Sequence, residues 1–131
     1  MAIHFLGIGA QKAGTSWVHA CLYEHPEICS PVKEIHFFSR DRFKQGTDWY
    51  EAHFDRCPTS AKRGEFSTSY LYSPVAAERI AHTYPTVRVI AILRHPVRRA
   101  YSQYRNAIKA GEITPDVSFS EYVERAPSCL E

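Results

Sequence analysis

The sequence predicts an α/β fold in three layers, with a central parallel sheet flanked by helices. Two apolar stretches rich in β-forming residues support it, residues 3–8 and residues 87–93. Each is followed by a segment with helical periodicity, and the second stretch is apolar enough to be a central strand covered on both faces. Because alternating strands and helices build parallel sheets, we expect ligands at the carboxyl ends of the strands.

The other elements follow from turn, capping and periodicity signals. The first helix is expected to bury one side, made of Trp17, Val18, Ala20, Cys21 and Leu22. The remaining expected elements are a strand at 27–30, an extended segment at 33–38, a loop at 40–47, a short helix at 48–54, a helix from the N-cap Ser73 and Pro74 to Pro85, a helix from Pro96 to the C-cap Gly111, and a helix at 118–124.

Length and composition are those of one globular domain, residues 1–131. Hydrophobic residues make up 44% of the chain and charged residues 23%, which argues against a disordered chain. The formal net charge of +2 is too small to indicate a nucleic-acid partner. No apolar stretch is long enough to cross a bilayer, so we expect no membrane partner. The sequence leaves homo-oligomerisation open.

The four cysteines show no metal-ligand spacing, and neither do the seven histidines. We therefore expect no structural metal. The cysteines are Cys21, Cys29, Cys57 and Cys129. Nothing else in the sequence suggests secretion, so free thiols in a reducing compartment, and with them a cytoplasmic location, are the expectation.

A glycine-rich turn joins the first strand to the first helix. Its sequence, G-A-Q-K-A-G-T-S-W from Gly9 to Trp17, is suited to binding an anion at a helix N-terminus. It almost fits the phosphate loop G-x-x-x-x-G-K-[ST], but Thr15 stands where the lysine belongs and Lys12 lies inside the loop. The displaced lysine favours a different anion from the triphosphate of an ATP or GTP hydrolase. A glycine turn with a solvated lysine is the alternative.

Residues 11–17 resemble the 5′-phosphosulfate loop of sulfotransferases that use 3′-phosphoadenosine 5′-phosphosulfate (PAPS). The resemblance implies a P-loop-like fold and a cofactor-binding role for Gln11, Lys12, Ala13, Gly14, Thr15, Ser16 and Trp17. A second motif supports it. R-H-P-V-R-R-A-Y-S-Q-Y at residues 94–104 resembles the 3′-phosphate motif of the same family, which implies that Arg94 and Ser102 bind the 3′-phosphate. Without the resemblance, this basic helix could simply be a solvated face.

K-E-I-H-F-F at residues 33–38 contains a candidate acid–base pair. Alternation in an extended segment would put Glu34 and His36 on one face, although such pairs are often plain surface residues. The segment is similar to K-E-P-H-F-F of the carbohydrate-modifying sulfotransferase branch, which includes the heparan sulfate enzymes. That similarity implies Glu34 as general base with His36 beside it, and Ile35 replaces the usual proline. Some heparan-type enzymes carry a second lysine where this chain has Phe66.

Together the motifs predict the amino-terminal part of a PAPS-dependent sulfotransferase. Lys12, Glu34 and His36 are the expected catalytic residues, 3′,5′-ADP is the expected product, and no metal is required. The acceptor is expected to be a carbohydrate or another small molecule. Family domains continue beyond the length of this chain, so we expect a domain truncated at its C-terminus. The alternatives are a P-loop kinase or NTPase, and a non-catalytic or truncated nucleotide-binding domain.

Overall fold

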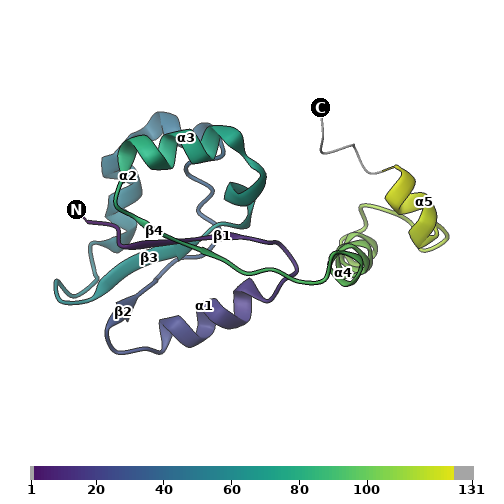
Figure 1. Ribbon diagram of the computed structural model, residues 1–131, viewed down its shortest axis with the longest axis horizontal. Helices are drawn as coiled ribbons and strands as arrows, with labels where there is room; N and C mark the ends of the chain where they lie inside the picture. Colours follow the sequence, from purple (N-terminus) through teal and green to yellow (C-terminus); the bar gives the residue numbers. More distant parts are fainter. Residues whose placement is uncertain (1, 126–131) are drawn as a thin grey trace. The chain divides into compact units, whose positions relative to one another are not determined.

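The computed structural model of the chain describes residues 2–125 (Figure 1). The chain forms two compact units, Met1–Leu93 and a second one that begins at Arg94.

The first unit is built on a four-stranded sheet. Its strands are β1 (Phe5–Gly9), β2 (Ile28–Cys29), β3 (Lys62–Phe66) and β4 (Arg88–Ala91), and they lie in the order β2-β3-β1-β4. Every pairing is parallel, with Leu6 of β1 opposite Glu65 of β3 and Val89 of β4. The structure thus confirms the α/β fold with a parallel sheet.

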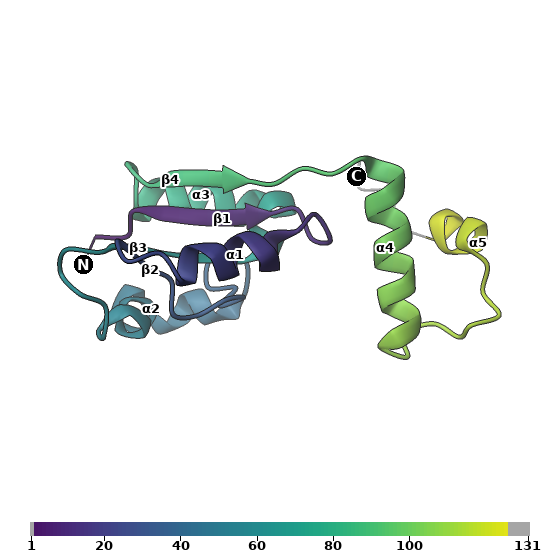
Figure 2. The same ribbon diagram turned by 90° about the horizontal axis from the view of Figure 1, so that it is seen from below.

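Helices cover both faces of this sheet. α1 (Thr15–Tyr23) lies on one face, and α2 (Thr47–Glu51) and α3 (Pro74–Thr83) lie on the other (Figures 1 and 2). Three short 3₁₀ helices complete the unit, namely η1 (Asp41–Gln45), η2 (Ala52–Phe54) and η3 (Thr68–Tyr72). The predicted helix at 48–54 corresponds to α2 and η2, whereas the expected loop at 40–47 contains η1. Ser73 caps α3 as expected, because its side chain accepts a hydrogen bond from the Ala76 N–H.

The core of the first unit is mostly aromatic. Phe37, Phe38, Tyr50, Phe54 and Phe66 are completely buried. Their rings stack or meet edge to face, as Phe37 does with Tyr50 at 4.7 Å between centroids. β1 can approach this core only because residue 7 is glycine: a Cβ there would lie 2.0 Å from the Phe66 ring.

The predicted buried side of α1 is right for Val18 and Leu22 and wrong for the other three residues. Trp17 is 73% exposed, Ala20 and Cys21 are exposed as well, and Thr15 is the buried residue of the helix. The inward face instead consists of Thr15, Val18, His19 and Leu22, which recur at the spacing of one helical face. His19 fits there because its Nε2 lies 3.1 Å from the Ser30 carbonyl and its ring packs edge-on against Phe66.

β4 does not have the central position that its apolar sequence predicts. It pairs only with β1 and forms an edge of the sheet in the described part of the chain. Val89 is 54% exposed, so the strand is not covered on both faces. An apolar run indicates that a strand can be buried, but its burial also requires other chain segments to pack against both of its faces.

The second unit consists of two helices in contact, α4 (Pro96–Lys109) and α5 (Phe119–Glu124). α4 ends in a Schellman motif, since the Gly111 N–H bonds to the Ile108 carbonyl and the Glu112 N–H to the Ala107 carbonyl. Gly111 has φ 72°, which confirms it as the terminating glycine. α5 begins with a capping box between Ser118 and Glu121.

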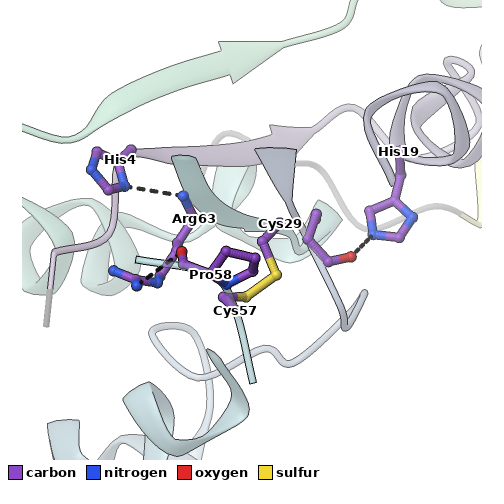
Figure 3. Close-up of a disulfide and its surroundings, with 7 residues drawn as sticks. His4, His19, Cys29, Cys57, Pro58 and Arg63 are labelled. Atoms are coloured by element: carbon purple, nitrogen blue, oxygen red, sulfur yellow. Dashed lines mark hydrogen bonds between the residues drawn. A yellow bond between two sulfur atoms is a disulfide. The ribbon is translucent and has the colours of Figure 1, made fainter. Parts of the chain in front are cut away.

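The prediction of free thiols is wrong for two of the four cysteines. Cys29 at the end of β2 forms a disulfide with Cys57 in the turn before β3 (Figure 3). Cys21 is free and exposed, and Cys129 lies outside the described residues. The two partners are 28 residues apart, so only the fold brings them together. Disulfides persist in oxidising surroundings, so the cysteines of this chain do not indicate a reducing compartment.

Among residues 2–125, no helix combines the length and the apolar character needed to pass through a bilayer.

Candidate active site

A cavity of about 390 Å³ lies where three parallel strands end. Its walls come from the segments that follow β1, β2 and β3, which is where ligands bind in parallel α/β sheets. The lining residues are Gln11, Lys12, Gly14, Thr15, Ser16, Lys33, Glu34, His36, Arg40, Thr68 and Tyr72. The structure therefore brings the predicted glycine loop and the predicted acid–base pair to one cavity.

The first wall of the cavity, residues 10–16, consists of the loop between β1 and α1 and the first two residues of α1. Gly14 has φ 100° and Lys12 has φ 63°, so the loop turns through left-handed backbone twice before α1 starts. Gly14 caps α1 with its carbonyl, which accepts from Trp17 N–H at 3.1 Å and Val18 N–H at 3.2 Å. Because the first N–H groups of a helix lack intrahelical partners and carry its positive dipole end, this wall suits an anion.

Glu34 is the most heavily engaged side chain of the second wall. Its carboxylate accepts hydrogen bonds from Lys33 Nζ at 3.0 Å, from Thr68 N–H at 3.0 Å and from Thr68 Oγ1 at 3.1 Å. Burial opposes ionisation of this carboxyl. The hydrogen bonds from Lys33 and Thr68, with the charges of Lys33 and His36, outweigh burial and hold the pKa of Glu34 below its ordinary value. Glu34 is therefore ionised at neutral pH.

His36 contacts Glu34 directly. Its Nε2 lies 3.2 Å from Glu34 Oε2, so this nitrogen carries the proton in the neutral ring. Burial lowers the pKa of His36, and the charges of Arg40, Arg42 and Lys33 lower it further, against the opposite effect of Glu34. The imidazole is therefore neutral at pH 7.

The two residues meet for a different reason from the one predicted. Residues 33–38 are not a regular extended strand: only Lys33 forms an isolated bridge, to Phe66. Glu34 has φ 60° and His36 has φ 55°, so strand alternation cannot set their directions. Hydrogen bonds from the segment after β3 hold them instead. Ser67 Oγ accepts the His36 N–H at 2.9 Å, and Ser69 Oγ lies 2.6 Å from His36 Nδ1.

The cavity also has lining residues that sequence reasoning did not single out, namely Lys33, Arg40, Thr68 and Tyr72. Lys33 and Arg40 add cationic side chains to the cavity beside Lys12, whereas Phe66 is buried in the core and does not line it. Thr68 lies two residues after the end of β3, so a polar run after a strand was the signal that could have identified it. Two residues expected to bind cofactor, Ala13 and Trp17, are not among the lining residues.

The cavity surface combines an anion-binding wall with a base. Two lysines and a helix N-terminus can hold a negatively charged donor, while Glu34 and His36 can take a proton from an acceptor placed beside it. In residues 2–125, no three His, Cys, Asp or Glu side chains are grouped so that they could hold a metal ion.

Arg94 and Ser102 belong to the second unit, where Arg94 precedes α4 and Ser102 lies within it. Their proposed contact with the 3′-phosphate of the same nucleotide stays a prediction.

Comparisons with known proteins agree on one family. Residues 3–128 match the family described as sulfotransferase domain. The bifunctional heparan sulfate N-deacetylase/N-sulfotransferase 3 of Homo sapiens is 35% identical over 140 residues, which cover 96% of this chain and 16% of that protein. The membrane-associated sulfotransferase kil1 of Dictyostelium discoideum is 30% identical over 109 residues, 81% of this chain and 23% of that protein.

A solved structure agrees with these sequence matches. The crystal structure of a sulfotransferase from Alicyclobacillus acidocaldarius superposes with a TM-score of 0.82 at 33% identity and covers 95% of this chain. This chain spans 56% of the length of that structure, and less than a quarter of each of the two curated relatives above.

Proposed function

From the premise that this chain belongs to the sulfotransferase family, we propose that it transfers a sulfuryl group from PAPS to a hydroxyl or amine of an acceptor. The observation that carries the proposal is the single cavity, in which the loop with Lys12 faces the pair of Glu34 and His36. A donor site without a base would support nucleotide binding alone. The same cavity offers both functions.

The glycine loop would hold the 5′-phosphosulfate. The N–H groups at the start of α1 would bind the phosphate oxygens, and Lys12 would neutralise the charge that develops on the oxygen bridging phosphorus and sulfur. Lys33 and Arg40 are further cationic side chains of the cavity, and Lys33 would help to balance charge on the sulfuryl oxygens. Preorganised donors of this kind typically contribute about 3 kcal/mol each to lowering the barrier.

Glu34 and His36 would remove the acceptor proton. The acceptor oxygen or nitrogen forms a bond to sulfur, the bond from sulfur to the bridging oxygen breaks, and 3′,5′-ADP leaves with that electron pair. Glu34 is ionised at pH 7 and can accept the proton directly as the bond forms, whereas neutral His36 would accept it at Nδ1, the nitrogen that faces Ser69 Oγ. The pair carries one negative charge before it takes the proton and none afterwards, and the contact of the two side chains would hold them in position during this change.

The acceptor is proposed to be a carbohydrate or a related small molecule. The support is the segment at 33–38 and the relatives whose names contain heparan sulfate N-sulfotransferase. Amines and hydroxyls both fit the chemistry, because either loses one proton on transfer.

Ligand-dependent stability tests the donor. Thermal unfolding is followed with 3′,5′-ADP in EDTA and with ATP and Mg²⁺, in the wild type, in Lys12→Ala and in the control Lys44→Ala, whose lysine is exposed on η1. We expect 3′,5′-ADP at about 100 times its Kd to add about 2.7 kcal/mol in the wild type and the control, and less in Lys12→Ala. Stabilisation by ATP with Mg²⁺ alone would replace the proposal with a P-loop NTPase.

Transfer itself is measured with PAPS and an oligosaccharide that offers both amines and hydroxyls. Release of 3′,5′-ADP that depends on the acceptor and is lost in Lys12→Ala supports the proposal. Stabilisation by 3′,5′-ADP without any transfer to an amine or hydroxyl would leave a non-catalytic nucleotide-binding domain.

A further inference from the structure

Glu65 is a buried carboxyl that the proposed mechanism does not use. It lies in β3 with an exposed fraction of 0%, one residue before the aromatic core residue Phe66. Buried carboxylates are costly unless they are hydrogen-bonded or protonated. Glu65 Oε2 accepts a hydrogen bond from Ser67 Oγ at 2.8 Å.

The Ser67 hydroxyl links Glu65 to the backbone of His36. A hydroxyl has one proton to donate, and Ser67 gives it to Glu65. The lone pairs of the same oxygen accept the backbone N–H of His36 at 2.9 Å. Glu65 thus selects the Ser67 rotamer in which the oxygen is free to accept from His36.

His36 needs such an anchor, because its backbone has φ 55° and belongs to no strand or helix. Left-handed backbone is unfavourable for a residue with a Cβ and persists only when the surroundings hold it. Residues after β3 supply that hold in sequence order: Ser67 binds the His36 backbone, Thr68 binds the Glu34 carboxylate and Ser69 contacts the His36 ring.

We propose that Glu65 is a positioning residue for the acid–base pair, and that it acts through Ser67 on the backbone of His36. Its importance for catalysis rests on the proposed sulfotransfer, whereas its effect on the geometry of the pair does not. Without it, Ser67 can turn away, the His36 N–H loses its acceptor, and the contact between His36 and Glu34 loosens.

The groups packed around Glu65 define its electrostatics. Burial and the charge of Glu34 raise the pKa of Glu65, the neighbouring hydroxyls of Tyr70, Ser67 and Tyr50 lower it, and the net result is a pKa raised to about 7. Oε2 can accept from Ser67 whether or not Oε1 carries a proton. A neutral acceptor of the same shape, such as glutamine, should therefore keep the anchor, and a hydrocarbon side chain should not.

The contact between His36 and Glu34 can be measured without any reaction. The His36 pKa is determined by NMR titration with and without Glu34→Gln, and the difference between the two pKa values is the coupling. Glu34 raises the His36 pKa, so Glu34→Gln lowers it in the wild-type background. We expect the coupling to fall to less than about half in Ser67→Ala and in Glu65→Leu, and to stay close to the wild-type value in Glu65→Gln.

Ser73→Ala is the matched control. It removes another serine hydroxyl that accepts a backbone N–H, at the start of α3, and should lower stability while leaving the coupling intact. If Glu65→Leu does not fold, Ser67→Ala decides, because it keeps the buried carboxyl and its packing. An unchanged coupling in folded Ser67→Ala would overturn the proposal.

Transfer kinetics then separate this inference from the proposed function. In an active enzyme we expect Glu65→Leu to lower kcat about tenfold with the KM for PAPS unchanged, and Glu65→Gln to restore most of it. Loss of the coupling in a chain that transfers nothing would refute the proposed function and leave the positioning role standing. Normal kcat in Glu65→Leu would refute the role in catalysis.

Discussion

The two walls of the cavity are built in opposite ways. The loop wall, residues 10–16, is shaped by backbone: two left-handed residues, a capping carbonyl and the N–H groups of a helix start. The base wall, residues 33–36, is held by side chains from a segment about 30 residues away, Ser67, Thr68 and Ser69. The loop wall should therefore keep its geometry when side chains are substituted and lose it when a glycine is replaced. The base wall should lose its geometry when any one of these hydrogen bonds is removed.

The largest effect is expected from removing the base itself. Glu34→Gln keeps the size of the side chain but removes the charge that accepts the proton, so kcat should fall by a factor on the order of 10²–10⁴. The affinity for 3′,5′-ADP should change little, because the loop wall is untouched. Steady-state kinetics and ligand titration measure the two separately. The control is Glu78→Gln, which changes an exposed glutamate of α3. An equal fall of kcat in both variants would contradict the role of Glu34.

The disulfide should contribute the next largest effect, on stability. Cys29 lies four residues before Lys33 on the chain that leads into the base wall, and its bond to Cys57 closes a loop of 28 residues. Chain entropy predicts a loss of about 3–4 kcal/mol in the free energy of unfolding for the double variant Cys29→Ala with Cys57→Ala. Urea unfolding measures it, with the free, exposed Cys21→Ala as control. Insensitivity of the wild type to reductant would contradict a disulfide in solution.

The sequence predicted the two walls of the cavity unequally well. The glycine spacing around Lys12 and Gly14 predicted the loop wall because its geometry is local: strand, turn and helix start are contiguous in the chain. Glu34 and His36 lie together as predicted, but the prediction rested on an extended segment that the structure does not contain. The residues that hold His36, Ser67 and Ser69, are brought to it by the pairing of strands that are distant in the sequence. No local sequence pattern predicts that pairing.

The same limit explains the errors in the fold. The sheet, its parallel pairing and the helix caps at Ser73 and Gly111 follow from local periodicity and capping, and these were correct. The burial of Trp17 and the central place of β4 depend on which segment covers each apolar face, and both predictions were wrong. The Cys29–Cys57 bond needed the same long-range information.

The titration of Glu65 should make the stability of the folded chain depend on pH. Its pKa is raised from 4.5 to about 7 in the folded chain, so between these values the folded state keeps a proton that the unfolded state has lost. The free energy of unfolding should therefore fall as pH rises through this window, by about 3 kcal/mol, and level off above it. Urea unfolding of the wild type and Glu65→Gln isolates the effect, because His36 and the other histidines are common to both. Parallel curves would contradict the raised pKa.

A smaller effect concerns the cation beside the base. The hydrogen bond from Lys33 is the strongest of the interactions that favour ionised Glu34, so Lys33→Met should raise the pKa of Glu34. The acid limb of the kcat/KM profile against pH should move to higher pH, since the base then loses its proton only at a higher pH. Lys44→Met is the control, because its ion pair with Asp41 is fully exposed. A shift of equal size in both variants would mean that the net charge of the chain, and not the contact of Lys33 with Glu34, determines the pH of the acid limb.

The smallest effect distinguishes the loop wall from an ordinary helix end. Gly14 and Gly111 both have positive φ, 100° and 72°, and a Cβ on either would meet nothing within 4 Å. Alanine at either position should therefore lower stability through backbone strain alone, by about 1 kcal/mol. Only Gly14→Ala should also weaken binding of 3′,5′-ADP, because only there must the backbone stay in place for an anion to approach its N–H groups. Thermal unfolding with and without nucleotide tests the pair. If the two variants lose the same affinity, the loop wall binds through its lysine and not through its backbone.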